Sequence, residues 1–272
     1  MTGSGSARWG WITRRIDPLG KAWSVAVEWR DEGVVLSVKS HGETSAIVEL
    51  FTAEHGRHAG LVRGGTSRRM KPVLQPGNSV TVSWRARLPE HLGNFTLDLD
   101  KARAGVLMDD PLSLAALSGA CAVVSALPER EAHAALYDAF IVLLDTLEQE
   151  AVWPAVFVRF ELGLLQELGF GLDLTRCAAT GETGDLAYVS PRTGRAVSVA
   201  AGEPYKDRLY KLPAFLIGGR LSTARPSDVA DGLRLTGHFL ERHLFGPFHG
   251  RLPDARYRLV ERLEVAHKKI ES

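Results

Sequence analysis

The segment from His55 to Pro89 carries seven Arg or Lys side chains and no Asp or Glu. If these cations share one face, they would bind a phosphate backbone through counterion release, with little dependence on base sequence. Two adjacent glycines, Gly64 and Gly65, would let the chain approach such a ligand closely. The candidate DNA-binding residues are therefore Arg57, Arg63, Arg68, Arg69, Lys71, Arg85 and Arg87.

Other interpretations of this segment differ in how well they fit. A solvated loop whose arginines keep a sheet edge from aggregating fits the composition equally well. A nucleoside triphosphate loop does not fit, because the G-x-x-x-x-G-K-[ST] spacing is absent. His58, Trp84 and Phe95 lie in or beside the basic strands and could stack on bases. A second basic run, which could extend the DNA path, comprises Lys206, Arg208 and Lys211.

Catalytic and metal-binding patterns are weak in this chain. His55 and His58 are three residues apart, but a turn and the start of a strand separate them, and no H-E-x-x-H motif occurs. Strand alternation and helix capping account for four aspartates that could otherwise hold magnesium for a nuclease. We therefore expect no enzyme activity and no cofactor. The four aspartates are Asp98, Asp100, Asp109 and Asp110.

The composition limits where the protein acts. The chain has 272 residues, 45% of them hydrophobic, and a formal net charge of +1, so any attraction to nucleic acid must be local. Two scattered cysteines, Cys121 and Cys177, do not form a secreted disulfide framework. The sequence contains no apolar run of the roughly 20 residues that a membrane span needs and no secretory signal. We expect a cytoplasmic protein with no membrane contact.

The first part of the chain predicts a small barrel. Residues 1–27 begin with a Gly/Ser run and predict a poorly ordered extension, with Val27 a possible alternative start. Residues 28–107 contain five short β-rich segments separated by Gly/Pro turns, which favours an oligonucleotide-binding (OB) barrel and leaves an SH3-like barrel open. The predicted strands are 33–39, 45–51, 57–63, 79–84 and 93–99.

From residue 108 to 272 the apolar spacing changes to three and four residues, which indicates helices. Asp109 or Asp110 before Pro111 is a typical helix start, and Gly169 and Gly171 end the third helix. A Gly-rich insertion over 173–205 interrupts the pattern. The fold class is α+β, a five-stranded barrel followed by a mainly helical domain. The predicted helices are 112–127, 131–150, 154–168, 226–245 and 253–267.

Several motifs resemble one bacterial family, the recombination mediators called RecO. The similarity covers roughly residues 28–250 and keeps the order of the family's motifs. The motifs in the N-terminal half are Glu32-Gly-Val-Val-Leu36, Gly42-Glu-Thr44, Phe51-Thr52, Glu54-His-Gly56, Gly64 and Leu74-Gln-Pro-Gly77. In the second half they are the helix Glu161–Phe170, Asp173-Leu174 and Cys177.

The resemblance implies an OB fold, a helical C-terminal domain and a nucleoid-associated protein. It also implies binding of single- and double-stranded DNA, annealing of complementary strands, and work with RecR and single-stranded-DNA-binding protein to load RecA. By the same resemblance, the basic strand–loop region contacts DNA. Arg159 and Arg176 could receive the acidic partner peptide that the family implies, and a solvated surface arginine is the alternative for each. The rival interpretation is an interaction adaptor whose barrel binds protein and not DNA.

The sequence departs from the family at its zinc site. Many members carry two C-x-x-C pairs in this region, but here the first pair is Cys177-Ala-Ala-Thr180 and the second has Ser198 and Ala201. One thiol of four remains, so a four-cysteine zinc site cannot form. The insertion 173–205 is therefore predicted to be a degenerate, zinc-free, zinc-finger-like unit with Cys177 as a relict ligand. Tyr188 and Val189 are predicted to pair with Val197 in a small hairpin.

Overall fold

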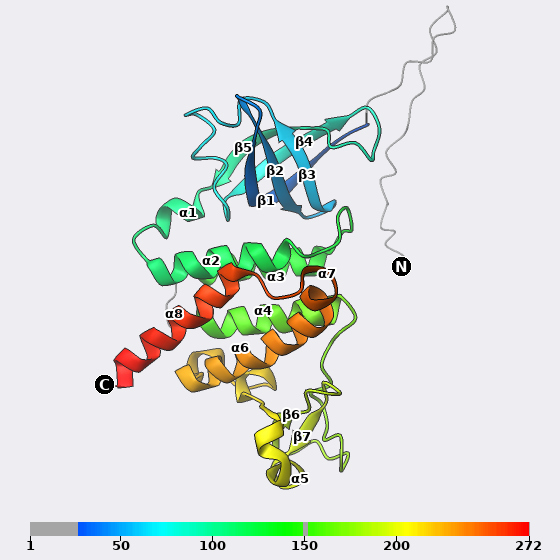
Figure 1. Cartoon of the computed structure of the whole chain (residues 1–272), viewed down its shortest axis with the longest axis vertical. Coiled ribbons are helices and arrows are strands. Elements are labelled where there is room, and N and C mark those ends of the chain that lie inside the picture. The colour runs from blue at the N-terminus through cyan, green and yellow to red at the C-terminus, as the bar shows by residue number, and fades with distance from the viewer. Residues whose placement is uncertain (1–26, 149–151, 272) are drawn as a thin grey trace, which may run out of the picture.

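The computed structural model describes residues 27–148 and 152–271, so the predicted extension lies outside the described residues except for Val27. Five strands close a barrel in the order β1-β2-β3-β5-β4, the arrangement of an OB fold (Figure 1). Antiparallel ladders join all neighbours except β3 and β5, which meet in parallel at Leu61 and Asn94. The strands are β1 (Val27–His41), β2 (Ser45–Thr52), β3 (Gly56–Val62), β4 (Ser79–Ala86) and β5 (Asn94–Lys101).

Residue alternation explains why these segments form strands. In β4, Val80, Val82 and Trp84 are buried in the barrel, while Thr81 and Arg85 face outward. All five predicted strands are present. β1 begins earlier than predicted because its first residues pair with the far end of β4, where Val27 lies opposite Ala86.

Helices fill the second half of the chain and lie beside the barrel (Figure 1). The Asp110 carboxylate accepts hydrogen bonds from the amides of Leu112 and Ser113, so Asp110 caps the second helix as predicted. At the end of the fourth, Gly169 adopts a φ of 81°, which favours glycine. The longer helices are α2 (Pro111–Val124), α3 (Ala134–Thr146), α4 (Trp153–Glu167), α6 (Pro226–Leu240) and α8 (Asp254–Glu271). The short ones are α1 (Arg103–Val106), α5 (Val199–Gly202) and α7 (Gly246–His249), and a π-helical turn spans Glu241–Phe245.

The insertion supplies two strands of a three-stranded sheet at the end of the molecule farthest from the barrel, and the third strand follows it in the chain (Figure 1). Tyr188 lies opposite Val197 and Val189 opposite Ala196, so the predicted hairpin is confirmed. Its strands are β6 (Leu186–Val189), β7 (Ala196–Ser198) and β8 (Tyr210–Lys211).

Two apolar clusters hold the molecule together. One fills the barrel, and the other runs through the helices and takes in Phe51, whose ring lies 5.5 Å from that of Tyr137 on α3. One outer face of the barrel is thus buried against α2 and α3. Deeper in the helices, Arg256 Nη2 donates to Glu161 Oε2 at 2.8 Å, a fully buried ion pair between α8 and α4. Across the described residues, no helix is both long enough and apolar enough to span a membrane.

Candidate nucleic-acid interface

The connection between β3 and β4, residues 63–78, is the basic loop. It begins with a tight turn in which the Ser67 amide donates to the Gly64 carbonyl at 3.0 Å, and Gly64 has a φ of 69°. Gly65 is needed for packing, because a Cβ there would lie 2.7 Å from the Ala46 Cβ. The two glycines therefore shape the loop itself, and their role as an opening toward a ligand is not needed to explain them.

The middle of the basic loop is folded into helical turns. The Lys71 amide donates to the Ser67 carbonyl at 3.1 Å, and the Leu74 amide donates to the Met70 carbonyl at 2.9 Å. Leu74 is buried in the barrel core, and Met70 and Val73 pack against the same core. Because these apolar side chains pack against the core, the backbone that carries the intervening cations is already ordered before binding, and only the exposed side chains remain to be ordered.

Asn78 fixes the end of the basic loop. This residue is buried, and its Nδ2 donates to the carbonyls of Pro72 at 2.8 Å and Val73 at 3.3 Å. Its Oδ1 accepts a hydrogen bond from the Ala104 amide, which lies beyond the barrel. The sequence shows only a turn at Gln75-Pro-Gly77, so nothing in it marks Asn78 as a loop anchor.

Four of the predicted residues present their charge on this loop. Arg63, Arg68, Arg69 and Lys71 are all exposed. Within residues 27–148 and 152–271, none of the four takes part in an ion pair. Thr66 holds the loop beside the β1–β2 turn. Its amide donates to the Thr44 carbonyl at 3.2 Å, and its hydroxyl donates to the Glu43 carbonyl at 3.3 Å. The result is a preformed surface of four uncompensated cations.

Arg57 lies elsewhere and is left out of this surface. Its side chain is 17% exposed and forms ion pairs with Glu49 on β2 and, at 3.5 Å, with Glu129. Its Nε donates to the Leu127 carbonyl at 2.6 Å. The charge of Arg57 therefore joins the barrel to the helices. Both carboxylates lie outside the segment 55–89, Glu49 on the preceding strand and Glu129 beyond the barrel, so the composition of the segment alone does not show the compensation.

Arg85 and Arg87 lie toward the end of β4 opposite Ser79, the residue that follows the basic loop. Arg85 is six residues from Ser79, roughly 20 Å along the strand, but its neighbour Asn94 on β5 also pairs with Leu61, close to the start of the loop at Arg63. Both arginines are exposed. Glu28 lies directly opposite Arg85 in the β1–β4 ladder, so the potential there is weaker than at the loop.

The expectation that His58, Trp84 and Phe95 could stack on bases is wrong. All three are buried inside the barrel, with His58 and Trp84 rings 5.0 Å apart, and Trp84 Nε1 donates to the Leu92 carbonyl at 2.9 Å. Burial, together with the charges of Arg130 and His55, lowers the pKa of His58 to about 4. These rings are core, and none is available to a ligand.

Ion pairs compensate two cations of the second basic run. Lys206 binds Glu203 at 2.7 Å, and Lys211 lies 3.6 Å from Asp231. Arg208 is exposed, with no ion pair to the described part of the chain. The run lies with the small sheet, at the far end of the molecule from the barrel (Figure 1), so it does not continue the surface of the basic loop.

The four aspartates proposed for magnesium are not assembled into a site. Asp110 caps α2, and Asp100 accepts a hydrogen bond from the Thr81 hydroxyl at 3.0 Å on the barrel surface. In the part of the chain that the structure describes, no three His, Cys, Asp or Glu side chains are placed to hold a metal ion. The nuclease alternative therefore has no geometric support.

Two of the positions compared with zinc ligands in the sequence, Thr180 and Ser198, lie beside the Cys177 sulfur. The Ser198 amide donates to Cys177 Sγ at 3.3 Å, and the Ser198 hydroxyl lies 3.4 Å from it. Hydrogen bonds from Ser198 and Thr180 lower the pKa of Cys177 to about 6. The thiol is satisfied by hydroxyl and amide donors, and a set with one sulfur and two hydroxyls does not fit tetrahedral thiolate zinc.

A groove between α4 and the insertion is a separate feature. It encloses about 780 Å³ and is lined by leucines, among them Leu162 and Leu174, together with Arg159. Arg159 donates from Nε and Nη2 to the Phe215 carbonyl at 3.0 Å and 2.6 Å, which orients its guanidinium. Arg176 is exposed but does not line the groove.

Comparison with known proteins identifies relatives over nearly the whole described chain. A family model described as Recombination protein O N terminal matches residues 26–98, and one described as Recombination protein O C terminal matches residues 108–252. A protein of Rhodospirillum centenum named DNA repair protein RecO is 58% identical over 244 residues, which is 89% of this chain and 96% of the relative. Proteins of the same name are 55% identical in Phenylobacterium zucineum, over 88% of this chain and 99% of the relative, and 54% in Caulobacter vibrioides, over 90% and 98%.

Proposed function

The chain belongs to the recombination protein O family of DNA repair proteins, and from that premise we propose that it is a DNA-binding recombination mediator whose principal DNA contact is the basic loop. The observation that carries the proposal is the set of four exposed, uncompensated cations on a loop that is already folded. Contacts of this kind reach phosphate oxygens, so binding tolerates any base sequence and accommodates single- and double-stranded DNA.

Annealing follows from holding strands by their backbones. When two complementary strands are bound to one protein, or to neighbouring copies, their pairing takes place at a raised effective concentration. Because the protein contacts the phosphate backbone and not the bases, the bases stay available to pair with a complementary strand. The same binding mode supports the handover that loads RecA together with RecR, and it keeps the protein with the nucleoid DNA.

The helical part, residues 108–272 in our proposed division, supplies the protein contacts. The leucine-lined groove with an oriented Arg159 suits a short peptide that carries an apolar side chain beside a carboxylate. We assign this groove to the acidic tail of single-stranded-DNA-binding protein. The insertion over 173–205 contributes Leu174 and Leu186 to one wall of the groove, beside Leu172, so it serves this contact in place of a metal-bound module.

Fluorescence anisotropy with a labelled 30-nucleotide single strand, measured across a salt series, tests the proposal. The expected result is sequence-independent binding whose affinity falls steeply as salt rises, together with faster annealing of two complementary strands. Absence of binding at low salt would overturn it and leave the adaptor function, in which the barrel contacts only protein. Strand cleavage that stops on addition of a chelator would instead support the nuclease alternative.

A further inference from the structure

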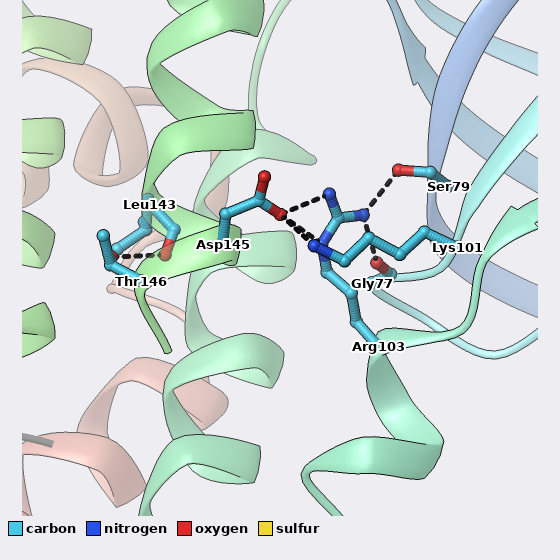
Figure 2. Close-up of polar contacts among 7 residues, drawn as sticks. All are labelled: Gly77, Ser79, Lys101, Arg103, Leu143, Asp145 and Thr146. Atoms are coloured by element: carbon cyan, nitrogen blue, oxygen red, sulfur yellow. Dashed lines mark hydrogen bonds and ion pairs between the residues drawn. The ribbon is translucent and has the colours of Figure 1, made fainter. Parts of the chain in front are cut away.

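Behind the basic loop, one buried arginine joins the barrel to helix α3. Arg103 is 4% exposed, and its Nε and Nη2 donate to Asp145 Oδ1 at 3.0 Å and 2.7 Å (Figure 2). Lys101 Nζ donates to the same oxygen at 2.9 Å. Asp145 therefore supplies the countercharge that lets the Arg103 guanidinium stay between the two parts of the molecule.

The other edge of the Arg103 guanidinium holds the base of the basic loop. Its Nη1 donates to the Ser79 hydroxyl and lies 3.5 Å from the Gly77 carbonyl (Figure 2). These residues flank Asn78, whose side-chain amide donates hydrogen bonds to the Pro72 and Val73 carbonyls of the loop. Asn78 also accepts from the amide of Ala104, the neighbour of Arg103. Hydrogen bonds of Arg103 and Asn78, joined by the backbone of residues 77–79, thus connect α3 with the loop that presents the cations.

The conformation of the basic loop depends on the Asp145–Arg103 pair because an unpaired charge is costly to bury. A guanidinium that loses its carboxylate partner is left uncompensated in a poorly solvated site, so it turns toward water. In doing so Arg103 releases Ser79 and Gly77, and the segment that positions Asn78 loses its support. The cations of the loop would then sample more conformations, and DNA binding would have to order them.

We propose that the Asp145–Arg103 pair is a positioning device through which helix α3 sets the DNA affinity of the basic loop. The inference rests on the proposed function, because it concerns the same DNA surface. Neither residue touches DNA in this account. Both act through Asn78 on the conformation of the four loop cations.

Two isosteric substitutions on α3 separate this device from simple electrostatics. Removing a carboxylate makes any protein less repulsive to DNA. Asp138→Asn, which alters an exposed side chain that makes no hydrogen bond or ion pair with the described residues, should therefore leave DNA affinity unchanged or slightly raised. Asp145→Asn removes the same charge, yet we expect about 3- to 10-fold weaker binding to the labelled single strand. Amide hydrogen exchange over residues 70–78 accelerates in Asp145→Asn and not in Asp138→Asn.

The proposal fails if Asp145→Asn binds DNA as tightly as Asp138→Asn and exchanges its loop amides at the wild-type rate. That result would leave the proposed function standing, since wild-type binding and its salt dependence are measured in the same series. If the wild type does not bind DNA, the proposed function fails, and the exchange comparison alone decides whether the pair positions the loop. Should Asp145→Asn not fold, Arg103→Lys is the second variant. It keeps the positive charge but cannot bond Asp145 and Ser79 at the same time as a guanidinium does, so it must show the same weaker DNA binding and the same faster amide exchange in the loop.

Discussion

The basic loop and the second basic run contain similar numbers of cations but differ in how much charge they expose. In the loop, Arg68, Arg69 and Lys71 project from a folded, packed segment without carboxylate partners in the described chain. In the second run, Lys206 and Lys211 are each held by an acidic side chain. A count of arginines and lysines therefore overstates the second surface, and the location of the nearest carboxylates decides which one attracts DNA.

The two regions also reach this outcome by different routes. Glu203 lies three residues before Lys206, so that pair forms locally on one helical turn. Asp231 reaches Lys211 only because α6 packs beside β8. The loop, by contrast, is flanked by barrel core and by the β1–β2 turn, where Glu43 contributes its carbonyl and makes no ion pair with the loop cations.

The largest effect is expected from removing the loop cations together. Changing Arg63, Arg68, Arg69 and Lys71 to Ala removes about four phosphate contacts, which lowers affinity for single-stranded DNA roughly 100- to 1,000-fold near 0.1 M salt. Anisotropy measures the loss, and the circular dichroism spectrum checks that the barrel still folds. Retention of wild-type affinity would remove the loop from the DNA surface.

Acidification is expected to act on the barrel through His58. Its pKa lies near 4 in the folded barrel and at 6.5 ordinarily, because burial disfavours the imidazolium. The unfolded chain therefore binds the extra proton between pH 6.5 and 4, and stability falls by at most about 3 kcal/mol as pH drops through that window. Denaturant unfolding at pH 7 and pH 4.5 measures this loss.

The matched variant for His58 is His58→Leu, which keeps an apolar side chain of similar size in the same cavity. It should lose the part of the pH dependence that falls between pH 6.5 and 4. It should also be no less stable than the parent at pH 7, since neither imidazole nitrogen has a hydrogen-bond partner among the described residues. An unchanged pH profile in this variant would show that another group is responsible.

Releasing the lysines of the second run should make it resemble the loop. Glu203→Gln and Asp231→Asn together uncover Lys206 and Lys211, and the added positive potential should raise DNA affinity up to about tenfold at low salt. Anisotropy at two salt concentrations measures the gain. As a control, Asp138→Asn together with Glu264→Gln also removes two carboxylates, and neither of them makes an ion pair with Lys206, Arg208 or Lys211. A similar gain from the control would mean that net charge alone is being measured.

The smallest effect is expected from deleting the second run itself. Changing Lys206, Arg208 and Lys211 to Ala removes one uncompensated cation, Arg208, and two compensated ones, so affinity should fall about fivefold or less. A loss as large as that of the loop variant would contradict the distinction between the two regions.

Local features of this molecule were predictable from sequence, whereas ion pairs between separate elements, which neutralise some of the cations, were not. The five strands, the Asp110 cap and the 188–197 hairpin each depend on residues close in the chain, and all are present. Arg57 could not be assigned in this way, because Glu49 and Glu129 come from another strand and from beyond the barrel. In the same way, the residue alternation predicted that Trp84 lies in a strand, but it did not show which face of that strand points into the barrel interior.

The residues that could not be predicted from sequence lie behind the basic loop and support it. Asn78 is a polar side chain at the end of a loop and Arg103 is one at the start of the short helix α1, positions where such residues are usually solvated. Their burial follows from the way the barrel sits on α3, which no local pattern encodes. Only the structure shows that the loop is supported from the helical side.

The most direct test of the account is the salt dependence of single-stranded DNA binding for three proteins: the wild type, the loop variant and the second-run variant. The logarithm of the affinity should fall linearly with the logarithm of salt concentration, and the loop variant should lose about three units of that slope, while the second-run variant loses one unit or less. Equal losses in the two variants, or a larger loss in the second-run variant, would contradict the assignment of DNA binding to the basic loop.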